Sequence, residues 1–241
     1  GKTIRVGDFP LLWLTGGSGG YYDTYTGDTL LIPGTGCIWG GGASDYATVT
    51  TIDLRSKNLT TDFNFLNKFI NLSDFDIRSN NVINIDISSL IFLNYLRLDL
   101  NVNLVDLDVT LNVNLILLSA RNTNISSINI LNNINLTDLL LYNTNISSIN
   151  LSNNLLLNRI LLHNNNLTLI DLSNNTLLNF IQIQNNQLTA ATNSNILIDL
   201  DAHNLSSGFL QSSIFGGGTL TTAGLAAKAA LLLKGWTIVG L

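Results

Sequence analysis

The sequence predicts an α/β repeat protein, a solenoid in which each coil adds one short strand to a single parallel β-sheet. An apolar phrase of the form L-x-x-L-x-L-x-x-N/T recurs along the chain every 21 to 23 residues. A second alternating phrase, such as Ile146-Ser-Ser-Ile-Asn-Leu, lies between successive copies of the first. Self-similarity at a fixed period of this length is typical of stacked repeat architectures. The central apolar residue of the first phrase falls at Ile52, Phe75, Leu96, Leu118, Leu139, Ile160 and Ile181.

The leucines and isoleucines of these phrases are the predicted core. The x-L-x-L-x centre of the first phrase has the period of two that is typical of a strand with one buried face. A coil of about 21 residues cannot close a core alone, but stacked coils bury one apolar layer each. The sequence therefore predicts a continuous apolar column along the solenoid.

The asparagines have a structural interpretation. The chain turns a corner twice per coil, and backbone groups at a corner lack strand partners. A buried asparagine amide supplies two donors and an acceptor, so it can bridge the corners of successive coils. We expect one such ladder at Asn80, Asn101, Asn165 and Asn186, with Thr123 and Thr144 as substitutes. We expect a second ladder at Asn112, Asn133, Asn154 and Asn175.

The repeat resembles a known family. The stretch 170–189, IDLSNNTLLNFIQIQNNQLT, is similar to the 21-residue leucine-rich repeats of Bacteroidetes surface proteins and their phages. The resemblance covers residues 49–188. It implies a leucine-rich-repeat solenoid with a parallel β-sheet on the concave face, and it leaves the ligand open because such repeats serve many partners.

Residues 1–48 form a first segment of different composition, rich in glycine and aromatic residues. Short strand-like runs at 3–6, 11–15, 29–32 and 47–52 alternate with glycine turns. Two interpretations remain open. The segment is either a β-rich cap that covers the open end of the solenoid or an attachment segment that docks to a larger assembly.

Residues 189–241 break the repeat and predict a helix-containing C-terminal cap. We expect a helix over 190–203, a strand within 208–214 and a closing strand at Trp236–Val239. A second helix should begin after Thr221 or Thr222 and end before Gly235. Leu225, Ala229, Leu232 and Leu233 define one apolar face of this second helix.

Composition argues against several functions. The formal net charge of −5 opposes a nucleic-acid surface, and the chain lacks the long apolar run of a membrane span. The single cysteine opposes a disulfide framework or a zinc site. We therefore expect no metal and no cofactor.

Catalytic candidates are few. His163 and His203 are the only histidines, and we interpret both as surface residues. The acids that could form a catalytic pair alternate with arginines, so we interpret them as cross-strand ion pairs. These residues are Asp53, Asp76, Asp99, Arg55, Arg78 and Arg97. The sequence thus predicts a protein that is not an enzyme.

The outward positions of the strand phrases predict a ligand-binding surface on the sheet face. Exposed aromatic, leucine and arginine side chains there are typical anchors of protein interfaces. The predicted binding residues are Tyr95, Arg97, Leu117, Arg121, Leu140, Tyr142, Arg159, Leu161, His163 and Phe180. The alternative is that terminal segments fold over this face, or that its leucines are scattered singly.

These features favour a recognition or adhesion module displayed on a phage particle, such as a tail fibre, or on a bacterial surface. The expected partner is a protein or glycan on a host or neighbouring cell, and the expected location is extracellular, at the cell surface or on the virion. The alternative is an architectural subunit that docks to other subunits through residues 1–48. A secreted carbohydrate-active solenoid is a further alternative.

Overall fold

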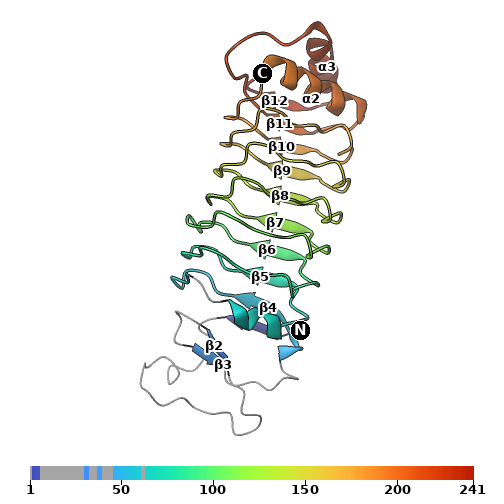
Figure 1. Cartoon of the computed structure of the whole chain (residues 1–241). Coiled ribbons are helices and arrows are strands. Elements are labelled where there is room, and N and C mark those ends of the chain that lie inside the picture. Colours follow the sequence, from blue (N-terminus) through green and yellow to red (C-terminus); the bar gives the residue numbers. More distant parts are fainter. Residues whose placement is uncertain (1, 6–29, 33–36, 40–45, 61–62) are drawn as a thin grey trace.

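The computed structural model describes residues 2–5, 30–32, 37–39, 46–60 and 63–241. In this part of the chain the coils stack into an elongated solenoid, and ten strands form one parallel sheet along one side of it (Figure 1). The sheet runs in the order β1 (Lys2–Arg5), β4 (Val49–Asp53), β5 (Asp74–Asp76), β6 (Tyr95–Arg97), β7 (Leu117–Ser119), β8 (Asp138–Leu140), β9 (Arg159–Leu161), β10 (Phe180–Gln182), β11 (Phe209–Gln211) and β12 (Thr237–Val239). The predicted parallel solenoid is confirmed.

The middle residue of each strand carries the core. From β4 to β10, the central apolar residues pair in register from one coil to the next. All of them are at most 1% exposed. The second phrase of each coil buries part of its apolar residues against the same column, as Ile125 and Ile146 are buried. One-residue slippage would turn the whole apolar set outward, so burial holds the register.

The first asparagine ladder satisfies the corner that follows each strand. Asn165 donates from Nδ2 to the carbonyl oxygens of Leu162 in its own coil and Leu141 in the preceding one, at 3.0 and 2.8 Å. Its Oδ1 accepts from the backbone N–H of Ile146 at 3.0 Å and from the Thr144 hydroxyl at 2.5 Å. Asn80, Asn101 and Asn186 make the equivalent bonds to two coils.

Threonine replaces asparagine in this ladder with a smaller reach. The Thr123 hydroxyl donates to the carbonyl of Ala120, three residues earlier in its own coil, at 2.8 Å. The Thr144 hydroxyl lies within hydrogen-bond distance of both the Leu141 carbonyl and Asn165 Oδ1 of the next coil, and it donates to one of them at a time. A hydroxyl has one proton, so threonine cannot supply the two donated bonds of an amide.

The second ladder lies at the opposite corner and is built differently. Asn154 donates to the carbonyl oxygens of Ile130 and Asn133 in the preceding coil, at 3.0 and 2.9 Å. Asn112, Asn133 and Asn175 also direct both bonds to the coil before them. The Oδ1 atoms of these four buried asparagines have no hydrogen-bond partner. Each member of the second ladder therefore stabilises the stack with fewer bonds than Asn165.

A left-handed residue turns the chain after each strand. The position is occupied by Asn122, Asn143, Asn164 and Asn185, with φ between 54° and 56°. Asparagine tolerates this region better than most residues. These exposed side chains also bond to one another from coil to coil, at 2.5 to 2.7 Å. Earlier coils place Ser56, Ser79 and Leu100 at this position.

Two helices replace the loop segments of the last coils. The helix α2 (Ala190–Ala202) begins at Thr189, whose hydroxyl accepts from the N–H of Thr192, and α3 (Thr222–Leu233) begins at Thr221 in the same way. The predicted positions of both helices and of the last two strands agree with the structure. The helices cross closely where Gly224 meets Ser194, because a Cβ at Gly224 would lie 2.6 Å from the serine side chain.

The prediction that the leucine face of α3 packs against the solenoid is wrong. Leu225 and Leu232 are half exposed, and Leu233 is 90% exposed. The helix instead buries Gly224, Ala227 and Leu231. The small residues occupy the buried face because they let α3 approach α2 closely, which the bulkier leucines would prevent.

At the N-terminal end, β1 pairs in parallel with β4. The strands β2 (Leu30–Ile32) and β3 (Cys37–Trp39) form a separate antiparallel pair. The sequence analysis did not predict β3, and the predicted strand at 11–15 lies outside the described residues. The short 3-10 helix η2 (Asn64–Lys68) occupies the first loop and buries Phe65 and Leu66.

The two ladders predict different costs of asparagine removal. Asn165→Ala removes four hydrogen bonds and leaves the Ile146 N–H without a partner among the described residues, whereas Asn154→Ala removes two bonds to carbonyls that each keep a backbone donor. We expect Asn165→Ala to lower the free energy of unfolding by about 3 kcal/mol and Asn154→Ala by about half as much. Urea unfolding followed by circular dichroism measures both. The exposed Asn153→Ala is the control and should be close to neutral; equal costs at positions 165 and 154 would contradict the bond-by-bond account.

The C-terminal cap depends on a close approach of Gly208 to Trp236. A Cβ at Gly208 would lie 2.5 Å from three ring carbons of Trp236, which is buried and donates from Nε1 to the Leu205 carbonyl at 3.0 Å. Gly208→Ala should therefore destabilise the cap by about 2 kcal/mol, because the ring cannot move aside without breaking that bond. Thermal unfolding measures the loss, and Trp236→Phe in the same chain should restore part of it. Ser206→Ala nearby is the control.

Candidate functional site

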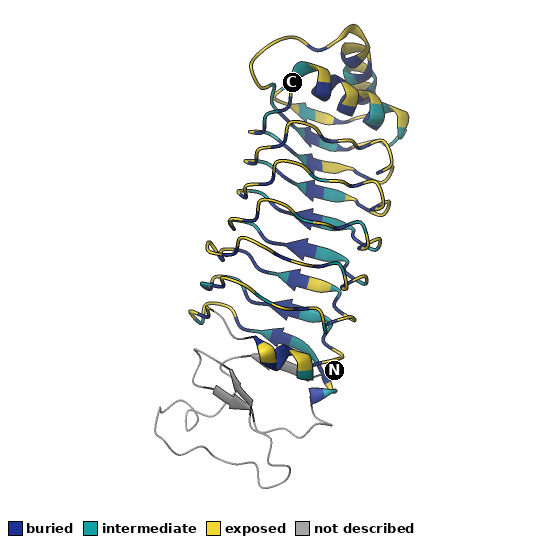
Figure 2. Cartoon of the chain, viewed as in Figure 1, coloured by how far each residue is buried: buried dark blue, intermediate teal, exposed yellow. Residues whose placement is uncertain are grey.

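The sheet face presents side chains in straight rows, because the strands pair without slippage from β4 to β12. One row runs through Tyr95, Leu117, Asp138, Arg159 and Phe180, each directly opposite the next. Figure 2 shows the strands alternating between buried and partly exposed positions along this face. The sheet is thus a rigid surface whose chemistry is set by one residue per row and coil.

The predicted binding residues lie on this face with different exposures. Tyr95 and Phe180 are the most open, at 37% and 36%. Partly exposed positions are Arg97, Leu117, Arg121, Tyr142, Arg159, Leu161 and His163. The predicted exposure of Leu140 is wrong, because this leucine is only 7% exposed. Leu140 lies directly opposite Leu161 in the next strand, and neighbouring strands are only about 4.8 Å apart. Adjacent side chains therefore leave little of Leu140 exposed to solvent.

A stacked cluster occupies the middle of the face. The rings of Tyr142 and His163 lie parallel, with centroids 4.3 Å apart and an interplanar angle of 15°. The Arg121 guanidinium lies 5.4 Å from the Tyr142 ring centroid and donates to its hydroxyl at 3.3 Å. Burial lowers the pKa of His163 and so favours its neutral ring. The cluster therefore offers aromatic surface with one positive charge at its edge.

Ion pairs fix the other arginines of the face. Arg97 pairs with Asp74 of the preceding coil at 2.6 Å and lies over the Tyr95 ring at 5.5 Å. Arg159 pairs with Asp138 of the preceding coil, also at 2.6 Å. Both pairs cross between strands, which the sequence predicted for Arg97. The same prediction is wrong for Arg55 and Arg78, which bond mainly to an aspartate two residues away in their own coil.

The sequence analysis missed Phe209 as a residue of this face. Phe209 in β11 stacks on Phe180, with centroids 5.0 Å apart and an interplanar angle of 19°. The signal was present in the sequence, because Phe209-Leu210-Gln211 repeats the pattern of Phe180-Ile181-Gln182. The aromatic surface therefore continues onto the first coil of the cap.

The residues considered for catalysis have structural partners. His203 contacts the Ser173 carbonyl at 3.2 Å, and Asp201 near it in the chain pairs with Lys234 at 2.7 Å. Asp99 pairs with Arg121. Among the described residues, no group of three or more His, Cys, Asp or Glu side chains could hold a metal ion. Over the same residues, no helix has the length and apolar character needed to cross a membrane.

The comparisons with known proteins identify the fold. No protein-family model matches the chain. No curated protein matches its sequence either. Among solved structures, an internalin (inlF) of Listeria monocytogenes has a TM-score of 0.62 at 22% identity, over 79% of this chain and 52% of that one. Internalin C2 of the same species has a TM-score of 0.62 at 19% identity, over 83% of this chain and 84% of that one.

A third similar structure comes from another species. The Leptospira interrogans leucine-rich-repeat protein LIC12759 has a TM-score of 0.54 at 18% identity, over 81% of this chain and 62% of that one. The chain thus spans about half of the first internalin and under two thirds of the Leptospira protein. At these identities the likeness concerns the fold, and the chain folds as a leucine-rich-repeat solenoid.

Proposed function

We propose that this protein is a non-enzymatic recognition module that binds a partner protein through its sheet face. The observation that carries the proposal is the series of stacked aromatic residues on that face, Tyr142 on His163 and Phe180 on Phe209, bordered by arginines that ion pairs hold in place. Aromatic residues and arginine are the residue types that dominate the binding energy of protein interfaces.

The rigidity of the face supports binding. Phe180 and Phe209 stand on strands that are hydrogen-bonded on both sides, and Tyr142 and His163 lie two residues after such strands. Stacking within each pair restricts the rotamers of these side chains. Docking then orders few additional groups, which lowers the entropic cost of association. An open face of this kind suits the broad contact of a protein better than the enclosed reaction site of an enzyme.

The fold likeness to internalins is consistent with this role. From it and from the low charge of the chain we infer a place at a cell surface, in the extracellular space or on a virion, where the sheet face would meet another surface. A glycan partner is the alternative within the same role, and a binding experiment separates the two.

The proposal predicts that negative charges in place of Phe180 and Phe209 greatly weaken binding. In the double variant Phe180→Asp/Phe209→Asp, two aromatic anchors are replaced by carboxylates on the sheet face. We expect at least a thirtyfold loss of affinity, which corresponds to about 2 kcal/mol. Binding of the labelled protein to a panel of bacterial cells, with and without protease treatment of the cells, measures the loss and separates protein from glycan partners.

A matched control places the same change elsewhere on the solenoid. Leu155 and Leu169 are at least half exposed and lie in loop segments outside the sheet. Leu155→Asp/Leu169→Asp should bind like the unaltered protein, with both variants checked for folding by circular dichroism. Loss of binding in the loop variant together with full binding in the sheet variant would contradict the assignment of the face.

A further inference from the structure

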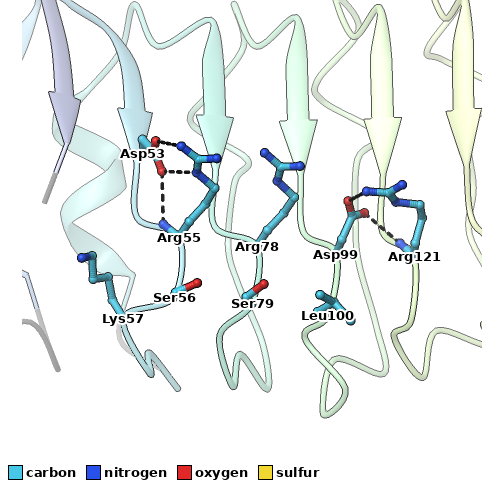
Figure 3. A pocket seen from close by; sticks show the side chains of 9 residues that line it. All are labelled: Asp53, Arg55, Ser56, Lys57, Arg78, Ser79, Asp99, Leu100 and Arg121. Atoms are coloured by element: carbon cyan, nitrogen blue, oxygen red, sulfur yellow. Dashed lines mark hydrogen bonds and ion pairs between the residues drawn. The ribbon is translucent and has the colours of Figure 1, made fainter.

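A cavity lies on the first coils, away from the aromatic pair Phe180 and Phe209. It has a volume of about 540 Å³ and opens beside the turns that follow β4, β5, β6 and β7. Figure 3 shows side chains from successive coils reaching toward it side by side. Its walls include Arg55, Lys57, Arg78, Arg121, Asp99 and Leu100. The volume is in the range of small-ligand sites.

The cavity concentrates positive charge in an acidic protein. Four of the eleven lysines and arginines of the chain line it, with the two carboxylates of Asp53 and Asp99. The lining therefore has a formal charge of +2, while the whole chain has −5. Asp76, which does not line the cavity, pairs with Arg78 at 2.6 Å.

The arginines are held in one orientation with donors to spare. Arg55 donates from Nε and Nη2 to Asp53 at 2.9 and 2.7 Å, and Arg78 bonds Asp76 in the same way. The backbone N–H of each arginine also donates to its aspartate, at 3.2 Å. Within the described part of the chain, the Nη1 groups of both arginines and the Lys57 ammonium have no hydrogen-bond partner.

The carboxylates of the lining are already engaged. Asp99 accepts from the Ser119 hydroxyl, from the backbone N–H of Arg121 and from its guanidinium. Figure 3 shows the Arg55 and Arg121 guanidinium groups against Asp53 and Asp99. The cationic groups of the cavity offer donors alone, and the hydroxyls of Ser56 and Ser79 can donate as well as accept, so the cavity favours accepting groups of a ligand.

Leu100 is a second, independent feature of the cavity wall. It has φ +62° at the turn position where the next four coils have asparagine, and it is half exposed. Leucine is less favourable than asparagine in the left-handed region, and an unfavourable backbone conformation of this kind is often kept at a functional site. Leu100 adds an apolar surface beside the cationic groups.

We propose that this cavity binds a small organic phosphomonoester. The phosphate would take the free donors of Arg55, Arg78 and Lys57, and the carbon skeleton would contact Leu100. A phosphomonoester has a charge of about −1.5 to −2 at pH 7, opposite in sign to the net charge of the lining. Arginine forks that are already oriented bind such an oxyanion with little loss of side-chain entropy.

An isolated ion pair of the same face provides the comparison. Arg159 pairs with Asp138 as closely as Arg78 pairs with Asp76, at 2.6 Å in both cases, but it does not line this cavity. If the arginine pairs served only the stability of the sheet, Arg159 and Arg78 would be equivalent toward an anion. The proposal requires them to differ.

Calorimetric titration of the full chain with phenyl phosphate tests the site, with phenol as the uncharged probe and inorganic phosphate as the probe without a carbon skeleton. We expect a Kd of about 1 mM for phenyl phosphate, weaker binding of inorganic phosphate and none of phenol. Arg55→Gln/Arg78→Gln should weaken binding at least tenfold, because two charge-assisted contacts are lost. Arg159→Gln should leave the affinity unchanged.

Two single variants keep the test decisive if the double variant unfolds. Lys57→Gln removes a cation that has no partner in the described part of the chain and should weaken binding about threefold to tenfold. Leu100→Asn should stabilise the fold and reduce the preference for phenyl phosphate over inorganic phosphate. Absence of binding, equal loss in Arg159→Gln, or equal affinity for phenol would overturn the proposal. None of these results touches the test at Phe180 and Phe209, so the two proposals fail separately.

Discussion

The stack depends on pairing the backbone polar groups at two buried corners in every coil. A coil of about 21 residues turns twice around an apolar column, and each turn leaves N–H and C=O groups that no strand can satisfy. Buried asparagine amides pair many of these groups and do so between coils, so that the same bonds that satisfy one turn also attach it to the next. The stacking that buries the leucines therefore also provides hydrogen-bond partners for the backbone groups at the corners.

A consequence of this register is that the residues that stabilise the fold differ from those that are available for binding. The inward residues of each strand are set by the apolar column and the corner residues by the ladders, so the outward positions are free to differ between coils. The early coils use them for arginine and aspartate, and the later coils use them for aromatic residues and leucine. The two proposed surfaces occupy neighbouring stretches of one sheet and share only Arg121.

The C-terminal cap shows how the solenoid meets its end. Helices α2 and α3 replace loop segments of the last coils, while β11 and β12 continue the sheet. Close contacts at Gly208 and Gly224 join the strands and helices, and Trp236 is buried against the first of them. The exposed leucines of α3 lie on the outer side of the cap, where a hydrophobic pattern alone suggested the core.

The sequence by itself determined the solenoid, its period, the strand centres, the rows of the face and the positions of both terminal helices. These properties follow from spacing along the chain, because a period of two within strands and of about 21 between coils leaves one way to bury the leucines. Only the tertiary structure decided that Leu140 is covered, that α3 buries its small residues, that Arg55 and Arg78 bond within their own coils, and that four cations enclose one cavity. These outcomes depend on the sizes and rotamers of side chains in adjacent coils, which meet in space although they are about 21 residues apart in the chain.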